Sequence, residues 1–298
     1  MALRQRVSTE KLFDVAPPEV FFVLSAAAQY TGAVIAIGLF DEMSPATVAW
    51  LRVLSAGIII TAVSWRHFSP RWTRHDFMAA AAFGISTALM NLFFYLAIDR
   101  LPLGKGVTIE FIGPIAVAAI QTRTKRNTAA LICAALGVVV LGGVEIGSEP
   151  LGLVFILLAS VMWAGYIVIG SRVALANRGI AGLGVGLIIG GLVITPFASS
   201  DAGVAFTHVD LFVAAVLVGV LSNAIGYGID QSTLRRIPVR RFSVLLALLP
   251  VCAAVFGFLF LDQTPTPVDL AGMALVLVGV AIQERERIDR HQTEAQTI

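Results

Sequence analysis

Three ionisable side chains lie inside long apolar stretches of the sequence: Arg52, Glu110 and Asp230. A charge in such surroundings is costly and usually faces a partner or a cavity. Arg52 lies seven residues after Pro45, and Glu110 lies seven residues after Leu103, near the starts of their stretches. At 1.5 Å of rise per residue, each side chain would lie about 10 Å from the same end of its helix. Opposite charges at equal depth predict an ion pair or a shared cavity.

Two interpretations of Arg52 and Glu110 follow from the residues alone. The first is structural, because two opposite charges that neutralise each other allow two helices to pack. The second is functional: the Arg52 guanidinium binds a substrate carboxylate, for which its planar fork of donors is suited, and Glu110 binds an amine or a proton. Asp230 is close in sequence to Arg235 and Arg236 at a helix end, which favours a surface ion pair there.

Amide and aromatic side chains are spaced so that they share helix faces. Asn91 and Tyr95 are four residues apart, so they would lie on one face. Asn223 and Tyr227 have the same spacing. Core packing or an interfacial position is the ordinary role of each aromatic residue, but as a group they could line a pocket for a small solute. The predicted substrate-contacting residues are Arg52, Glu110, Asn91, Tyr95, Tyr30, Trp163, Tyr166, Asn223 and Tyr227, and Glu110 is also the candidate for proton coupling.

The elements that must position these residues are membrane-spanning helices. Hydrophobic residues make up 57% of the 298-residue chain, charged residues make up 13%, and the mean hydropathy is +0.87, whereas soluble domains average about 45–50% and about 25%. A spanning helix needs about 20 mostly apolar residues. The sequence therefore predicts an all-α integral membrane protein with ten transmembrane helices, at Val20–Phe40, Pro45–Trp65, Phe77–Ile98, Leu103–Gln121, Thr128–Ile146, Leu151–Ser171, Ile180–Ala198, Leu211–Gln231, Val239–Leu261 and Val268–Gln283.

The distribution of basic residues predicts the orientation of these helices. Of the 21 Lys and Arg residues, Arg52 lies within a helix, and Arg100 and Lys105 lie in odd-numbered connections. The other 18 lie in the two tails and the even-numbered connections. Because cytoplasmic segments carry the excess of Lys and Arg, we expect both tails, residues 1–19 and 284–298, to be cytoplasmic.

A repeat with an offset of 136 residues relates the two halves of the chain. It matches Pro102 with Pro238, and it also matches Pro114 with Pro250. The same offset matches further residues in one ungapped register, among them Tyr30 with Tyr166 and Ser86 with Ser222. Each half, 20–147 and 151–283, would have five spans, so the halves would lie in opposite orientations. Inverted repeats of this kind are typical of alternating-access transporters, which bind substrate where the halves meet.

Two features predict irregular helix geometry. Pro114 and Pro250 lie inside predicted helices, where proline removes a backbone donor and kinks the helix. The glycine-rich stretch Gly182–Gly191 is explained equally well by a hinge or by close packing of a neighbouring helix.

The motifs around these residues resemble a known family. The block NLFFYLAIDRLPLGKGVTIEFIGPIAVA contains the Asn91–Tyr95 face, the Pro102 turn and the Glu110–Pro114 motif. With the later block from Ile237 to Ile282, it is similar to EamA-type permeases of the drug/metabolite transporter superfamily, and most similar to the threonine/homoserine exporter group. The second half matches through Pro238, Pro250 and Asp262–Pro265.

This resemblance implies a ten-helix exporter of amino acids or similar metabolites in the bacterial inner membrane, using the proton gradient. The exporter group often has a glutamate directly before the second-half proline, but Leu249 occupies that position here. Glu110 would therefore have to act without a second carboxylate at that place.

Other functions are left open at this point. An exporter of aromatic amino acids, drugs or nucleosides has the same sequence features, and so does an importer. A membrane-embedded transferase needs clustered Asp, His or Cys at an interface, and no HExxH motif or acidic pair occurs. A structural or sensory subunit would require neither buried charges nor inverted halves. We expect a small-molecule substrate and the lipid bilayer as partners, with no nucleic acid, cofactor, catalytic residue or metal; the sequence predicts no oligomeric state.

Overall fold

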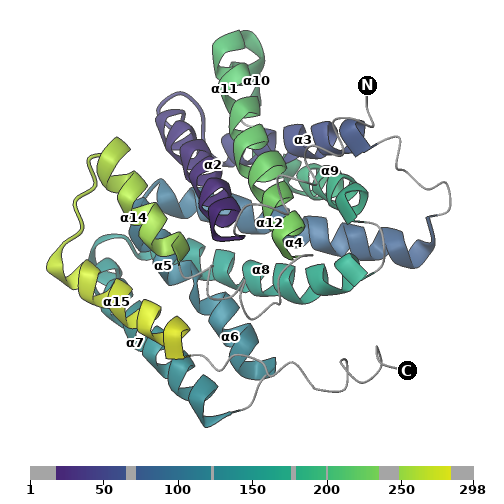
Figure 1. Ribbon diagram of the computed structural model, residues 1–298. Coiled ribbons are helices and arrows are strands. Elements are labelled where there is room, and N and C mark those ends of the chain that lie inside the picture. The colour runs from purple at the N-terminus through teal and green to yellow at the C-terminus, as the bar shows by residue number, and fades with distance from the viewer. Residues whose placement is uncertain are drawn as a thin grey trace, which may run out of the picture.

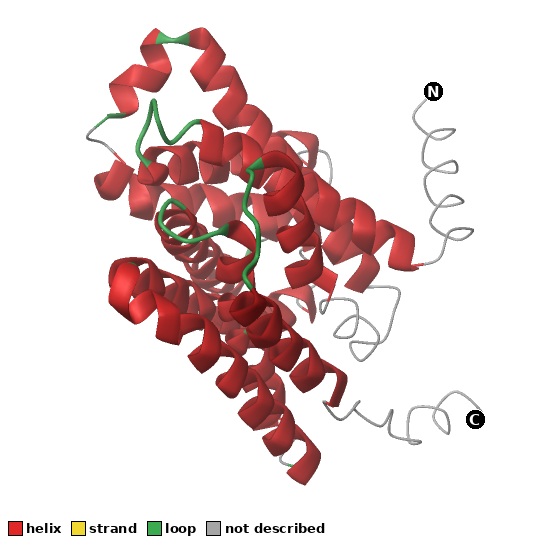
Figure 2. Cartoon of the chain, turned by 90° about the vertical axis from the view of Figure 1, so that its left-hand side faces the viewer, coloured by secondary structure: helices red, strands yellow, loops and turns green. Residues whose placement is uncertain are grey.

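The computed structural model describes residues 18–64, 72–121, 124–175, 179–198, 201–234 and 248–282. Within these ranges every regular element is a helix, and loops join the helices (Figures 1 and 2). The prediction of an all-helical protein is therefore confirmed for the part of the chain that is described.

The helices of the first half begin close to the predicted positions. The start of α4 is fixed by a capping box, in which the Thr73 hydroxyl accepts from the Asp76 amide and the Asp76 carboxylate accepts from the Thr73 amide. The helices are α2 (Pro18–Gly38), α3 (Pro45–Ser64), α4 (Arg74–Ile98), α5 (Leu103–Glu110), α6 (Ile112–Gln121) and α7 (Lys125–Ser148).

The second half contains the same kinds of element with two differences. The predicted eighth span is a continuous path of three segments, and the predicted ninth span is described only from Leu248 onward. The elements are α8 (Pro150–Leu175), α9 (Gly179–Ala198), α10 (Ala202–Thr207), α11 (Val209–Gly219), the π-helical segment η2 (Val220–Gly226), α12 (Tyr227–Leu234), α14 (Leu248–Phe260) and α15 (Pro267–Ile282).

Among the described residues, six helical stretches are long and apolar enough to cross a membrane: Val20–Gly38, Pro45–Ser64, Arg74–Ile98, Pro150–Ile169, Ala181–Ala198 and Val209–Asp230. Two shorter apolar helices are Leu249–Phe260 and Pro267–Gly279. Large apolar side chains also face outward, among them Val63, Val139 and Phe197. Lipid is the surrounding in which such a surface is stable, so the chain is a multi-pass helical membrane protein.

The predicted fourth span is interrupted next to its carboxylate. Helix α5 ends at Glu110, and α6 begins at Ile112. Pro114 has no backbone N–H, so it cannot donate to the carbonyl of Glu110 four residues earlier. The expected irregularity at Pro114 is thus present as a break between two helices. Pro250 lies in α14, which is described only from Leu248 onward, so the turn that a kink at Pro250 would affect lies outside the described ranges.

The helices pack in pairs that join the two halves of the chain. Helix α7 packs along α15, α3 packs along α9, and α5 packs along α14. Helix α4 lies between α8 and α9, while α2 packs against α11, η2, α12 and α14. In Figure 1 the α7–α15 pair lies at the lower left, beside the group formed by the other helices.

The glycine-rich stretch of α9 is a packing surface. A Cβ atom on Gly186 would press on the Ala80 carbonyl of α4, and one on Gly190 would collide with the Gly84 backbone. A Cβ on Gly84 would in turn collide with Gly186. Of the two interpretations of this stretch, the contacts support close helix packing, which brings α4 against α9.

Candidate solute-binding site

Arg52 lies on α3 with only 5% of its surface exposed, and it contacts the other half of the chain. Its Nε donates a hydrogen bond of 2.6 Å to Oδ1 of Asn223, which is fully buried in η2. The wider turn of a π-helix is common at functional sites. The hydrogen bond between Arg52 and Asn223 therefore connects two predicted site residues that come from different halves of the chain.

The same guanidinium lies against an aromatic ring. The Arg52 Cζ atom is 4.8 Å from the centroid of the Tyr95 ring on α4, and Tyr95 is fully buried. A guanidinium at this distance from a ring face gains a cation–π attraction, which is stronger away from water. Tyr95 and Asn223 thus hold the cation without neutralising its charge.

Glu110 ends α5 with 7% of its surface exposed. The charge of Arg52 acts on its carboxyl group, so the two groups lie within electrostatic range. The described Arg52 contacts, however, go to Asn223 and Tyr95. The arrangement is a shared buried polar region that holds two separate charges.

Asn91 and Tyr227 complete this region. The Asn91 amide donates to the Thr87 carbonyl at 2.7 Å, and its side chain also interacts with the Tyr227 hydroxyl. That hydroxyl lies within electrostatic range of both Arg52 and Glu110. Residues from α3, α4, α5, η2 and α12 therefore meet at one place.

The remaining predicted residues surround this place mainly through ring packing. Tyr166 lies between two rings, with its centroid 4.9 Å from that of Phe83 and 6.2 Å from that of Tyr227. Tyr30 packs on Phe256 at 6.0 Å and lies within electrostatic range of Glu110 and Tyr227. Trp163 packs edge-on against Phe111 at 5.3 Å, one residue from Glu110.

Two buried donors in this region, Nδ2 of Asn223 and the hydroxyl of Tyr95, have no hydrogen-bond partner among the described residues. The Nδ2 atom of Asn223 is buried and makes no hydrogen bond, although Oδ1 of the same amide accepts from Arg52. An unpaired buried N–H group is costly, and it could donate to a carboxylate or hydroxyl of a bound solute. This unpaired donor could not be predicted from the residue pattern, because the partner of Asn223 depends on helix rotation.

Asp230 was expected in a surface ion pair, but its described partners are the polar side chains of Ser25 and Gln29. It is half-buried and accepts hydrogen bonds from Ser25 Oγ at 2.6 Å and from Gln29 Nε2 at 3.1 Å. These bonds tie α12 to α2. The expected partners Arg235 and Arg236 lie outside the described residues.

Two polar clusters were missed by the sequence analysis. Lys105, counted with the third connection although the predicted span starts at Leu103, lies inside α5 and forms an ion pair of 2.9 Å with Asp269 on α15. Asp201 accepts hydrogen bonds from Thr47 and from Ser44. Burial raises the pKa of the Asp201 carboxyl, but the hydrogen bonds from Thr47 and Ser44 outweigh burial and hold its pKa below the ordinary 3.8.

A metal centre has no support in the described part of the chain, where no three His, Cys, Asp or Glu side chains gather. Cys133 and Cys252 are free thiols on α7 and α14. What the structure assembles is a buried set of polar side chains between membrane helices, which is the kind of site that solute transporters use.

Comparison with known proteins agrees with this class. Residues 150–283 match the model of the EamA-like transporter family. The threonine/homoserine exporter RhtA of Escherichia coli K12 is 32% identical over 265 residues, which cover 88% of this chain and 89% of that protein. RhtA of Salmonella typhimurium LT2 is 31% identical over 275 residues, covering 91% and 92%.

The fold also has a solved counterpart. A crystal structure of another protein superposes with a TM-score of 0.61 over 89% of this chain and 95% of that one, at 16% identity. That likeness concerns the fold alone. The chain belongs to the EamA-like transporter family, and it is a membrane transporter and not an enzyme.

Proposed function

We propose that this protein exports a small polar metabolite, an amino acid such as threonine or homoserine, across the bacterial inner membrane by alternating access. Arg52 binds the α-carboxylate, Asn223 donates from its unpaired Nδ2, and Glu110 binds the ammonium group or a proton. Asn91, Tyr95, Tyr30, Trp163, Tyr166 and Tyr227 line the site. The two RhtA relatives, named as threonine/homoserine exporters, support the substrate class.

The observation that carries this proposal is the surrounding of Arg52. Its buried guanidinium is held by a neutral amide and a ring, at the contact between the two halves of the chain. A buried cation without a directly bound carboxylate is poised to accept one from a ligand, because an Arg–carboxylate pair forms strong, bidentate hydrogen bonds.

The helix contacts support two inverted five-helix halves. In chain order, the five spans of the first half are α2, α3, α4, α5–α6 and α7, and those of the second half are α8, α9, α11–α12, α14 and α15. If the halves are equivalent, each contact between them should have a counterpart with the halves exchanged. The counterpart of the contact between α4 and α8 is the contact between α11–α12 and α2. The contact of α4 with α9 maps in the same way onto that of α11 with α3, and the contact of α5 with α8 maps onto that of α14 with α2. All six of these contacts occur.

The serines matched by the 136-residue offset make equivalent bonds. Ser86 on α4 donates to the Met162 carbonyl of α8 at 2.8 Å. Ser222 in η2 donates to the Gln29 carbonyl of α2 at 3.2 Å. In each case the third span of one half bonds to the backbone of the first span of the other half, which supports the proposed duplication.

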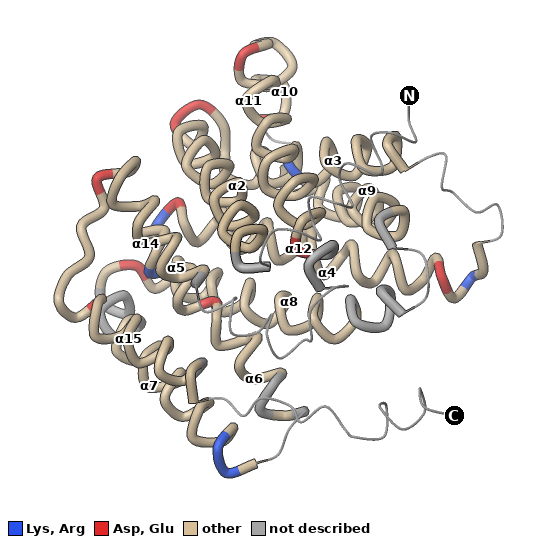
Figure 3. Tube along the Cα trace, viewed as in Figure 1, with Lys and Arg blue, Asp and Glu red and all other residues tan. Residues whose placement is uncertain are grey.

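Contacts between loops support the proposed orientation. The odd-numbered connections touch one another: Arg100 pairs with Glu149 at 3.7 Å, and the Leu103 amide donates to Gln263 at 2.8 Å. The Asp201 cluster joins the first connection to the seventh. In Figure 3 acidic segments lie at the ends of α2, α10 and α14, while the basic start of α7 lies at the bottom of the view. We therefore propose that the acidic side is the outer one and that both termini are cytoplasmic.

The test is efflux from proteoliposomes that contain the purified protein. Vesicles are loaded separately with L-threonine, L-homoserine, L-phenylalanine or uridine, and the initial rate of release is compared with that of protein-free vesicles. We expect release of the first two solutes only. Release of phenylalanine or uridine alone would replace the proposed substrate with an aromatic amino acid or a nucleoside, and no release of any solute would refute export of these classes.

Proton coupling is measured in the same vesicles. If Glu110 carries a proton inward as the solute leaves, release of threonine should make the external medium more alkaline, as reported by a pH-sensitive dye. Release at an undiminished rate without a pH change would show facilitated diffusion instead.

A further inference from the structure

A second pair of buried charges lies apart from the Arg52 site. The Nζ atom of Lys105 on α5 is 2.9 Å from Oδ1 of Asp269 on α15, and only 7% and 8% of these side chains are exposed. Asp269 is held in place by a capping box at the start of α15, since Oδ2 accepts from the Thr266 amide at 3.0 Å and the Asp269 amide donates to the Thr266 hydroxyl at 3.2 Å.

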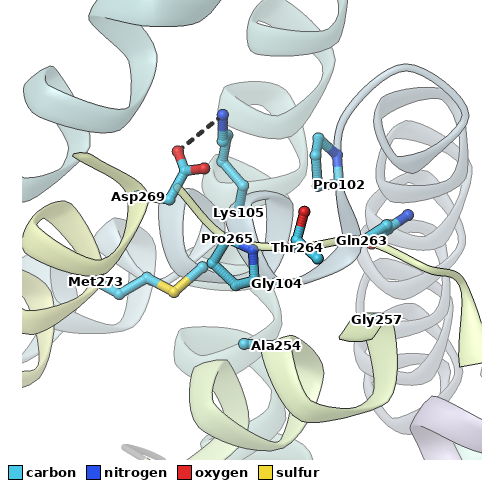
Figure 4. Close-up of a pocket in the computed structure, with 10 residues that line it drawn as sticks. All are labelled: Pro102, Gly104, Lys105, Ala254, Gly257, Gln263, Thr264, Pro265, Asp269 and Met273. Atoms are coloured by element: carbon cyan, nitrogen blue, oxygen red, sulfur yellow. Dashed lines mark ion pairs between the residues drawn. The ribbon is translucent and has the colours of Figure 1, made fainter. Parts of the chain in front are cut away.

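This pair borders a small cavity of about 90 Å³. Figure 4 shows Lys105 and Asp269 pointing toward each other above it, with Met273 and Ala254 on its other sides. The walls come from α5, α14, α15 and the connection that contains Gln263, Thr264 and Pro265. The cavity has room for a few water molecules or the head group of a small solute, and it is much smaller than a site for a drug-sized ligand.

Stability gives little reason for a charge pair at this place. Removing two charges from water is costly, and a buried pair is often no more stabilising than apolar side chains of similar volume. The neighbouring helices do not depend on the charge pair for their contact. Helices α5 and α14 pack closely beside it, as shown by Gly104, where a Cβ atom would press on Ala254. Opposite charges at the edge of a cavity have a direct use if the ligand carries both signs.

The pair is also placed on the side proposed to be outer. Lys105 is two residues beyond Leu103, whose amide binds Gln263 of the ninth connection. Glu110, the carboxylate of the central region, lies five residues further along the same helix. A solute that leaves the central site toward the outside would pass close to this end of α5.

We propose that Lys105 and Asp269 form an outer binding site for the zwitterionic head group of an amino acid. The α-carboxylate binds the Lys105 ammonium and the α-ammonium binds Asp269, so the internal ion pair is exchanged for two pairs with the ligand. This inference rests on the proposed function for its ligand class, but the site can be tested without transport.

The experiment measures binding of glycine to the purified Arg52→Ala protein by isothermal titration calorimetry. The substitution removes the central carboxylate partner, so the remaining binding reports on the outer site. We expect one glycine per chain. Ethanolamine lacks the carboxylate and lactate lacks the ammonium group, so each should bind at least about tenfold more weakly. Absence of glycine binding, or equal binding of all three compounds, would overturn the proposal.

A second variant assigns the binding to the pair. Adding Lys105→Met and Asp269→Leu to Arg52→Ala removes both charges together, so neither is left buried alone, and glycine binding should disappear. The matched control adds Arg100→Ala instead, which breaks an exposed ion pair on the same side and should leave binding unchanged. Glycine binding that survives the loss of both charges would disprove the site. Threonine release by the unsubstituted protein is a separate result, so failure of the outer site and failure of the proposed function are distinguished.

Discussion

Arg52 and Lys105 are both buried cations on helices of the first half, but their partners differ. Lys105 faces a carboxylate at 2.9 Å, so its charge is balanced within the protein. Arg52 faces the neutral amide of Asn223 and the ring of Tyr95, so its charge is held in place without being balanced by direct contact. The comparison teaches that burial alone does not identify a binding site. The nearest partner decides what a ligand must do to bind: a carboxylate can bind Arg52 directly, whereas at Lys105 it must first replace Asp269.

The strongest test of this comparison is Arg52→Ala. Because it removes the proposed carboxylate partner, release of threonine should fall by at least about 100-fold, to the rate of protein-free vesicles. The charge-conserving Arg52→Lys has no guanidinium fork and should retain a small part of the rate. Initial release rates measure both, and full transport by Arg52→Ala would exclude this residue from the mechanism.

Glu110→Gln is expected to have the next largest effect on transport. The amide is nearly isosteric but cannot take up a proton, so threonine release and the accompanying pH change should both be lost. Membrane insertion, judged by the yield of monodisperse purified protein, should be unchanged. A variant that still releases threonine and still moves protons would show that another group carries the coupling.

The Lys105–Asp269 pair should respond as a unit when stability is measured. Asp269→Leu leaves Lys105 buried without that carboxylate, which should cost about 3–5 kcal/mol of unfolding free energy, whereas the double variant Lys105→Met/Asp269→Leu should be close to neutral. Thermal unfolding in detergent compares the variants. An unchanged melting temperature of Asp269→Leu would show that Asp269 does not balance the charge of Lys105, which would contradict the contrast drawn with Arg52.

Packing of α4 on α9 should matter more than an average surface contact, because α4 carries Asn91 and Tyr95. Gly84→Ala introduces a methyl group against the Gly186 backbone and should destabilise the protein by about 1–3 kcal/mol. Gly203→Ala in α10 is the control, since nothing lies within 4 Å of its Cβ position. Equal melting temperatures for the two variants would contradict the close approach of α4 and α9.

The smallest effect is expected at Asp201, a carboxylate between α9 and α10 that is held by neutral donors instead of a cation. Its pKa is lower in the folded state than the ordinary 3.8, so it stabilises the fold above that pH, and the contribution is lost as the pH falls through the lowered value. In Asp201→Asn this acid-side loss should be absent, with a difference of less than about 1 kcal/mol because the site is partly exposed to solvent. Melting temperatures between about pH 2 and pH 5 test this, and parallel curves would disprove it.

The sequence predicted the helices better than their contacts. Apolar length alone placed most helix bounds within a few residues, and the separation of Arg52 and Glu110 from their helix starts predicted a shared region. The partner of Arg52 could not be predicted, because the direction of Asn223 depends on the π-helical turn of η2 and on the rotation of α3. Lys105 was counted with the preceding connection although the predicted span begins at Leu103, and its ion pair could not be predicted because the approach of Asp269 depends on how α15 packs beside α5.

The π-helical segment η2 has a consequence for how this protein tolerates length changes. Each wide turn accommodates one residue more than an α-helical turn, so the seven residues of η2 turn the chain about as far as six α-helical residues. Deleting a single residue between Val220 and Gly226 would therefore restore regular winding while α11 and α12 keep nearly the same rotation. The side chains inside the segment, Asn223 among them, would change direction, so the span would survive a shortening that the binding site would not.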